Sequence, residues 1–117
     1  MLVSAKDMLN AAAKGHYAVA AFNTNNLEWA ASILDAAEAT QSPVIIQCTS
    51  GAAKWQVSFK VVADIVKNLV EDKNITVPVA LHLDHGTYED CLKLPGALEM
   101  RRNRIDRKDD RKAKRVF

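Results

Sequence analysis

The chain has 117 residues, which is enough for one ordinary domain with a modest core. Hydrophobic residues make up 49% of it and charged residues 26%, and the formal net charge of +2 at pH 7 is also typical of a soluble globular protein. This composition excludes a membrane-spanning protein, because no apolar run approaches the roughly 20 residues that cross a bilayer, and with no long apolar stretch at the N-terminus it predicts a cytoplasmic location.

The first predicted element is a helix that begins after Ser4. A serine at the N-cap, followed three residues later by the acidic Asp7, is a common helix start, and Gly15 is expected to end the helix. Residues 16–22 follow as a mostly apolar run of strand length that ends at Asn23. The chain is therefore expected to open with a helix and a strand.

The next predicted elements are a helix, a strand and a further helix. Asn25 and Glu28 form a second capping-box pattern, which predicts a helix to about residue 39. The β-branched run after Pro43 predicts the second strand. Apolar residues at helical spacing then predict a helix over residues 58–72.

The third strand is predicted over residues 77–83, and Thr87 is suited to cap a short helix over residues 88–93. Nearly apolar strands that alternate with amphipathic helices indicate a parallel sheet covered by helices. Ligands of such folds bind at the carboxyl ends of the strands. The polar or small strand ends, which we expect to converge on one site, are residues 23–25, 49–51 and 84–86.

Asp84 and His85 are the strongest candidates for chemistry, because they end an apolar strand. Neighbouring strand residues point to opposite faces, so both side chains reach one site only where the strand gives way to a loop, and Gly86 is expected to allow this. An aspartate there can move a proton, and a neutral histidine can bind zinc. The alternative is a helix-capping aspartate beside a hydrogen-bonded surface histidine.

Three other polar side chains lie near the predicted strand ends. Ser50 could hold a substrate oxygen or phosphate, and its alternative role is that of a turn or cap residue. Asn23 is first of all a turn former, although it could also face the site. His82 is expected to be a core residue or to orient the neighbouring carboxylate. The two tryptophans, Trp29 and Trp55, are expected to be packing residues rather than stacking platforms.

The two cysteines, Cys48 and Cys91, are too few and too far apart for a disulfide framework or a Cys-x-x-Cys metal site. We expect both to be free thiols that are buried or partly buried.

Four segments occur in the order and spacing seen in class II fructose-bisphosphate aldolases, and the chain resembles the bacterial branch that carries a His-Leu-Asp-His-Gly motif. These segments are residues 22–28 (Phe-Asn-Thr-Asn-Asn-Leu-Glu), 42–46 (Ser-Pro-Val-Ile-Ile), 50–54 (Ser-Gly-Ala-Ala-Lys) and 81–86 (Leu-His-Leu-Asp-His-Gly). The resemblance covers residues 1 to about 93. Tagatose-bisphosphate aldolases are close relatives of this family, so a tagatose enzyme is an alternative.

The resemblance implies an α/β fold that forms the first three βα units of a TIM (β/α)8 barrel, preceded by an N-terminal helix. It also implies a zinc-dependent lyase of glycolysis that reversibly cleaves fructose 1,6-bisphosphate to dihydroxyacetone phosphate and glyceraldehyde 3-phosphate. In this family Asp84 corresponds to the catalytic proton donor and His85 to the first of three histidine ligands of the zinc. Ser50 corresponds to a contact with the glyceraldehyde 3-phosphate half, and Asn23 is a second expected substrate contact.

The resembled site also needs two more zinc-binding histidines and a glycine-rich phosphate loop from later strands, and this sequence carries neither. A catalytic zinc normally has three protein ligands, and three strands leave unpaired edges where eight would close a barrel. We therefore expect the chain to be inactive alone and to associate as a homo-oligomer or with a complementary barrel fragment. A non-enzymatic interaction fragment is the alternative function.

The basic residues are concentrated in the last part of the chain. Residues 1–93 carry 7 Lys or Arg and 10 Asp or Glu, whereas residues 94–117 carry 9 and 4, so the charge changes from −3 to +5. We expect an aldolase-like part over residues 1–93 and a non-homologous tail over residues 94–117, which a frameshift in the coding sequence would explain. The tail could bind nucleic acid, but its interspersed aspartates favour a solvated helix or a disordered extension.

Overall fold

The computed structural model of the protein describes residues 1–92. Helices and strands alternate along this part of the chain. In order they are α1 (Ala5–Gly15), β1 (Ala20–Asn23), α2 (Leu27–Ala39), β2 (Val44–Thr49), α3 (Ser50–Trp55), α4 (Phe59–Asp72), β3 (Val79–Asp84) and α5 (Tyr88–Leu92). The predicted alternation is confirmed, and α3 is an additional helix that the sequence analysis did not anticipate.

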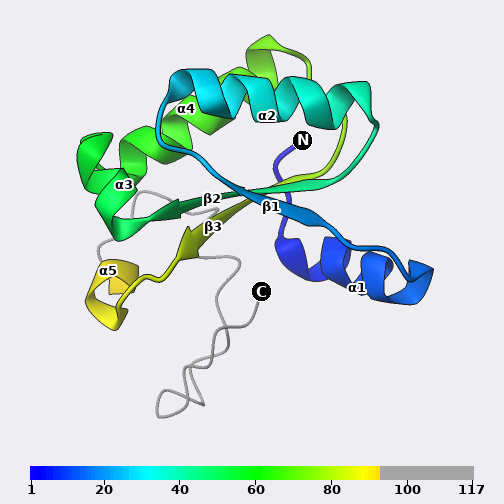
Figure 1. The fold of residues 1–117 in the computed structure, drawn as a ribbon, viewed down its shortest axis with the longest axis horizontal. Coiled ribbons are helices and arrows are strands. Elements are labelled where there is room, and N and C mark those ends of the chain that lie inside the picture. The colour runs from blue at the N-terminus through cyan, green and yellow to red at the C-terminus, as the bar shows by residue number, and fades with distance from the viewer. Residues whose placement is uncertain (93–117) are drawn as a thin grey trace.

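The three strands form one parallel sheet in the order β1-β2-β3. Helices α2 and α4 lie together on one face of the sheet, whereas α1 lies on the other face (Figure 1). Parallel strands need crossover helices, and this arrangement supplies them. The predicted α/β class with a helix-covered parallel sheet is thus confirmed, and closure into part of a TIM barrel stays a prediction.

The main hydrophobic core lies between the sheet and helices α2 and α4. Alternate residues of the central and third strands face these helices, while Ile45 and Ala80 face α1 on the opposite side of the sheet. Burying each large aliphatic side chain contributes about 1.5–3 kcal/mol. The largest fully buried aliphatic side chains of this core are Leu34, Val44, Ile46, Val62, Val66, Val79 and Leu81.

The first two helices begin where the sequence predicts, except that α2 begins one residue later. The Ser4 side chain caps α1 by accepting the Lys6 amide, as predicted. Helix α2 begins one residue later than expected, because the Asn26 side chain, and not that of Asn25, accepts the backbone N–H of Trp29 at 2.9 Å. The residue directly before a helix is the one whose side-chain oxygen can accept from the unpaired backbone N–H groups of the first turn.

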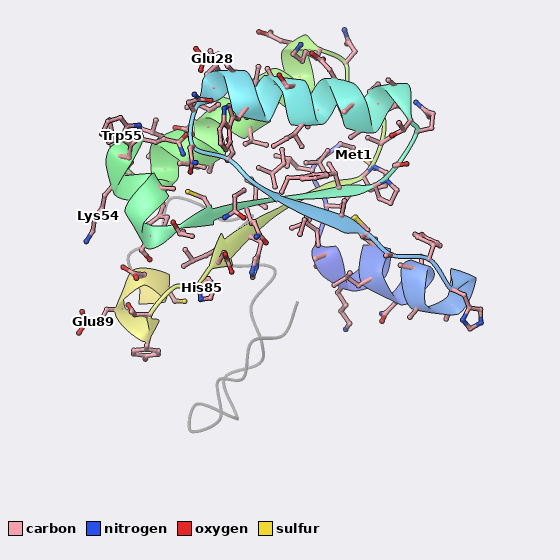
Figure 2. The ribbon with its side chains drawn as sticks, in the orientation of Figure 1. Met1, Glu28, Lys54, Trp55, His85 and Glu89 are labelled. Carbon is pink, nitrogen blue, oxygen red and sulfur yellow. The ribbon has the colours of Figure 1, made fainter. Side chains whose placement is uncertain are left out.

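The first helix ends where the sequence predicts. Gly15 is the last residue of α1, and His16 follows it as the C-cap in a left-handed conformation, with φ 55°. A Cβ on Gly15 would lie 2.8 Å from the Tyr17 ring, so a larger residue there would force this half-exposed side chain to shift. The packing role expected of the tryptophans is wrong for Trp55, which is 83% exposed at the end of α3 (Figure 2).

The cysteine prediction is confirmed. Cys48 is a buried free thiol and Cys91 a partly buried one. Burial raises the pKa of the Cys48 thiol to about 11, which keeps it protonated and unreactive at neutral pH.

Among residues 1–92 no helix is long and apolar enough to cross a membrane. The predicted basic tail over residues 94–117, and the frameshift hypothesis attached to it, lie outside the described residues.

Candidate functional site

The carboxyl ends of the strands bring the predicted site residues to one edge of the sheet. Thr49 at the end of β2 is the register partner of Asp84 at the end of β3, and Ser50 follows Thr49 directly. Asn23 ends β1 opposite Gln47 of β2. The expected convergence of the three strand ends is therefore present.

Asp84 and His85 lie close together because the backbone bends at His85 itself. His85 adopts a left-handed conformation with φ 52°, which releases it from the alternation of the strand. Its Nε2 atom lies 3.7 Å from Oδ1 of Asp84. The Asp84 side chain is 20% exposed and the His85 side chain 60% exposed, so a partly shielded carboxylate stands beside an accessible imidazole.

Gly86 acts differently from the prediction. Its own φ is not positive, so it does not provide the bend. A Cβ on Gly86 would lie only 2.3 Å from Cδ2 and 2.5 Å from Cγ of Leu83. The glycine is therefore needed because the loop after β3 folds back against the Leu83 side chain.

Ser50 is not a free hydroxyl in an open turn. It is the first residue of α3, and its Oγ donates to Oδ2 of Asp90 at 2.7 Å. The same carboxylate oxygen accepts the backbone N–H of Thr87 at 3.1 Å and its hydroxyl at 2.9 Å. Asp90 thus ties α5 to the start of α3, a link that no local sequence pattern predicts because it joins two helices far apart in the chain.

The predicted alternative role of Ser50 as a cap falls to its neighbour. Thr49 is the N-cap of α3, and its Oγ1 accepts the backbone N–H of Ala52 at 3.1 Å. The hydroxyl-bearing residue in register with Asp84 is therefore Thr49, whereas Ser50 lies one step further along.

A row of polar residues crosses the sheet just before the strand-end residues Thr49 and Asp84. Asn23, Gln47 and His82 are successive register partners on the three strands. Nε2 of Gln47 donates to Oδ1 of Asn23 at 2.9 Å. Oε1 of Gln47 is buried and has no hydrogen-bond partner among residues 1–92. Such a buried acceptor costs free energy until a donor reaches it.

His82 shares the face of Asp84, as predicted from the alternation of the strand. It is half-buried, and this burial lowers the pKa of His82, an effect that the nearby Asp84 carboxylate partly offsets. A neutral imidazole can take part in hydrogen bonds both as a donor and as an acceptor. The expectation that His82 helps to orient the carboxylate stays a prediction.

The described residues do not fit a complete catalytic zinc site. Such a site normally has three protein ligands, yet no group of three His, Cys, Asp or Glu side chains within residues 1–92 could hold a metal ion. His85 contributes one accessible imidazole beside one carboxylate. The expected zinc therefore needs ligands from outside the described residues.

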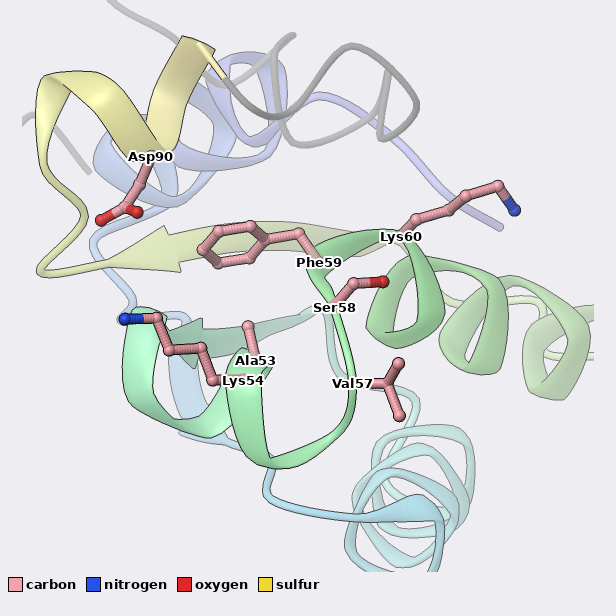
Figure 3. Close-up of a pocket in the computed structure, with 7 residues that line it drawn as sticks. All are labelled: Ala53, Lys54, Val57, Ser58, Phe59, Lys60 and Asp90. Carbon is pink, nitrogen blue, oxygen red and sulfur yellow. The ribbon is translucent and has the colours of Figure 1, made fainter.

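A cavity of about 250 Å³ lies away from the predicted site residues at the strand ends (Figure 3). It opens between α3, the start of α4 and Asp90 of α5, and none of the predicted site residues lines it. The residues that line it are Ala53, Lys54, Val57, Ser58, Phe59, Lys60 and Asp90. The lining is mainly apolar, and the cavity is separate from the strand-end carboxylate and imidazole.

Comparison with known proteins connects this geometry to one family. A family model described as "Fructose-bisphosphate aldolase class-II" matches residues 3–99. A fructose-bisphosphate aldolase of Streptococcus pyogenes serotype M3 is 58% identical over 92 residues, which cover 79% of this chain and 31% of that protein. The enzyme of the same name from Geobacillus stearothermophilus is 58% identical over 91 residues, which cover 77% of this chain and 32% of that protein. The chain thus spans about a third of the length of these curated relatives.

Two solved structures share the fold. The YdjI aldolase from Escherichia coli K12 matches with a TM-score of 0.69 and 35% identity, over 80% of this chain and 36% of that chain. The fructose-bisphosphate aldolase from Campylobacter jejuni matches with a TM-score of 0.62 and 24% identity, over 81% of this chain and 30% of that chain. The second likeness shows the fold alone.

Proposed function

The chain belongs to the class II fructose-bisphosphate aldolase family, and from this premise we propose that it supplies one part of an active site for reversible aldol cleavage of fructose 1,6-bisphosphate. The observation that carries the proposal is the placement of Asp84. It ends β3 at the carboxyl edge of a parallel sheet, partly shielded from water and next to an exposed imidazole. The fructose names of the curated relatives favour this sugar over its tagatose isomer.

In this proposal Asp84 is the acid and base that moves a proton as the carbon–carbon bond breaks or forms. Its partly buried position favours this role, because a carboxylate is more effective at proton transfer away from bulk water. Asn23 and Ser50 contact the substrate from the ends of β1 and β2. Because the Ser50 hydroxyl donates to Asp90, it can donate to a substrate oxygen only by sharing or releasing that hydrogen bond.

His85 is the proposed zinc ligand of this part of the site. It cannot hold a catalytic zinc without ligands from elsewhere, so the 117-residue chain is proposed to be inactive alone. We further propose a sugar bisphosphate or triose phosphate as substrate and a cytoplasmic, glycolytic setting. The aldolase part is proposed to end near residue 93, within the family match that runs to residue 99.

The proposal can be tested in a graft protein, in which residues 1–92 replace the matching segment of the Geobacillus stearothermophilus aldolase. We expect the graft to release triose phosphate from fructose 1,6-bisphosphate in a coupled assay with added zinc. Asp84→Asn should lower kcat by about 10²–10⁴, the usual contribution of a general acid or base. The host must lack its own aldolase.

Asp64→Asn is the matched control, because Asp64 is an exposed carboxylate of α4 that pairs with Lys60 away from the strand ends. This variant should keep kcat within about twofold, as surface pairs contribute little. A graft that folds, as judged by circular dichroism, but loses no more activity with Asp84→Asn than with Asp64→Asn would refute the role of Asp84.

A further inference from the structure

The Asp90 carboxylate joins two helices that lie far apart in the sequence. Part of its bonding belongs to the start of α5, where Oδ2 of Asp90 accepts the backbone N–H of Thr87 at 3.1 Å. The Asp90 amide donates back to Oγ1 of Thr87 at 3.2 Å. This reciprocal pair, three residues apart, is a capping box. A role confined to the cap would need no further partner for Asp90.

The hydrogen bond from Ser50 has no part in that cap. Oγ of Ser50 donates to the same carboxylate oxygen at 2.7 Å, across 40 residues of sequence. A hydroxyl that donates to a carboxylate at this distance makes one of the stronger hydrogen bonds found in proteins. Both side chains are partly buried, which protects the bond from competition with water. Figure 1 shows α5 beside the start of α3, where this bond lies.

The bond fixes the direction of the Ser50 hydroxyl and not the position of its backbone. The backbone at Ser50 is set by α3, because Thr49 caps this helix by accepting the Ala52 N–H at 3.1 Å. A serine side chain has three staggered rotamers, and its hydroxyl carries one proton. A carboxylate accepts hydrogen bonds and donates none. The Ser50 proton therefore points to Asp90, and the side chain is held in one rotamer.

This rotamer matters because of the place of Ser50 in the sheet. Thr49 is the register partner of Asp84, and Ser50 follows Thr49 at the carboxyl edge. Ser50 thus lies one residue beyond the partner of the proposed acid and base. A side chain that is held in one rotamer before binding loses less conformational freedom when its ligand arrives.

We propose that Asp90 is a positioning residue that acts through Ser50. It holds the Ser50 hydroxyl at the carboxyl edge of the sheet in the rotamer that meets the substrate, and it shares the hydroxyl proton when a substrate oxygen arrives. The inference rests on the proposed function, in which Ser50 contacts the sugar bisphosphate, and it adds the residue that prepares this contact. Asp90 itself does not touch the substrate.

A role in the cap alone makes a different prediction. If Asp90 served only the start of α5, a change on either side of the capping box would affect substrate binding equally. Thr87→Ala is therefore the matched control, because it removes the Thr87 hydroxyl from the cap and leaves the bond from Ser50 to Asp90 in place. Asp90→Asn is the conservative variant, since its amide oxygen can still accept from Ser50.

The first measurement is the rotamer of Ser50 in the full 117-residue chain, read by NMR from the scalar couplings between its Hα and Hβ atoms. The native chain, Asp90→Asn and Thr87→Ala should each show one rotamer, whereas Asp90→Ala should show rotamer averaging. Averaged couplings in the native chain would overturn the inference. So would a single rotamer in Asp90→Ala that is folded as judged by circular dichroism.

The second measurement uses the graft protein with fructose 1,6-bisphosphate. Asp90→Ala should raise KM about 3–10-fold, because the Ser50 side chain must then be ordered on binding, and should keep kcat within about twofold. Asp90→Asn and Thr87→Ala should each keep KM within about twofold. In a Ser50→Ala background, Asp90→Ala should not change KM further, because its effect passes through Ser50.

Three results in the graft would contradict the role of Asp90: an unchanged or lower KM in Asp90→Ala, an equal rise in Thr87→Ala, and the same rise where Ser50 is already replaced by alanine. Failure of the proposed function gives a different result. A folded graft without turnover counts against that function, and the rotamer of Ser50 then decides the role of Asp90. Turnover with a KM that does not depend on Asp90 counts against Asp90 alone.

Discussion

The residue that shapes the candidate site most directly is His85. Its left-handed backbone costs a residue with a Cβ about 1–2 kcal/mol, and it turns the imidazole to the same edge as the Asp84 carboxylate. Strain of this kind is typical of functional sites. Without it, alternation along β3 would send the two side chains to opposite faces of the sheet.

Gly86 leaves room for the Leu83 side chain in the loop after β3, which leads to a prediction about stability. Gly86→Ala should lower the free energy of unfolding by about 1–3 kcal/mol, because the new Cβ would overlap the Leu83 side chain. Urea unfolding followed by circular dichroism measures the change.

Gly51→Ala is the matched control for this prediction. Gly51 lies in α3, and a Cβ there would meet only Oγ1 of Thr49, at 3.9 Å. Because alanine is a better helix former than glycine, this variant should be neutral or more stable by up to about 1 kcal/mol. Equal destabilisation by both substitutions would contradict the role assigned to Gly86.

At the scale of elements, most of the helices and strands could be predicted from the sequence, but the loops that make the site could not. Hydrophobic periodicity and capping residues predicted the bounds of β2 and α4 closely, because these are local features of the sequence. The Ser50–Asp90 bond joins α3 to α5, two helices that lie far apart in the sequence. No local pattern encodes such contacts.

The start of α2 provides a test of the cap identified in the structure. Asn26→Ala should destabilise the protein by about 1 kcal/mol, because the Trp29 amide loses its side-chain acceptor. Asn25→Ala, at the position favoured by the sequence pattern, should change stability by less than about half of that. A larger effect at Asn25 than at Asn26 in thermal or urea unfolding would show that the helix starts one residue earlier.

Glu38 connects α2 to the segment before β3 and makes stability depend on pH. Its carboxylate accepts the Thr76 amide at 2.8 Å and the Thr76 hydroxyl at 2.7 Å, and the hydroxyl bond is the largest of the causes that lower the pKa of Glu38 to about 2. A depressed pKa stabilises the fold above the ordinary value of 4.5, and this stabilisation is lost as pH falls to about 2.

We therefore expect the urea midpoint of the native protein to fall between pH 4.5 and about 2, and to fall less in Glu38→Gln. Glu38→Gln should also be less stable than the native protein at pH 7. Glu71→Gln, a change at an exposed carboxylate of α4, should keep the native pH profile. Parallel pH profiles of the urea midpoint for the native protein and Glu38→Gln would show that the hydrogen bonds from Thr76 to Glu38 do not make stability depend on pH.

At the scale of the whole molecule, the two edge strands of the described sheet differ in how far other segments cover them. The β3 side is partly covered by the N-terminal segment, whereas β1 presents an open edge and an exposed Phe22. The family and the position of Asp84 and His85 could be predicted from the motif order in the sequence. The hydrogen bond that occupies Ser50 and the buried acceptor of Gln47 could not, because both arise only when the strands come together.

The most direct test of the account is to locate zinc in the graft protein by anomalous X-ray diffraction. The account predicts one zinc ion at the carboxyl edge of the sheet, about 2.0–2.1 Å from a ring nitrogen of His85, with the remaining ligands from the grafted relative. Zinc bound elsewhere, with His85 uncoordinated in a folded graft, would contradict it.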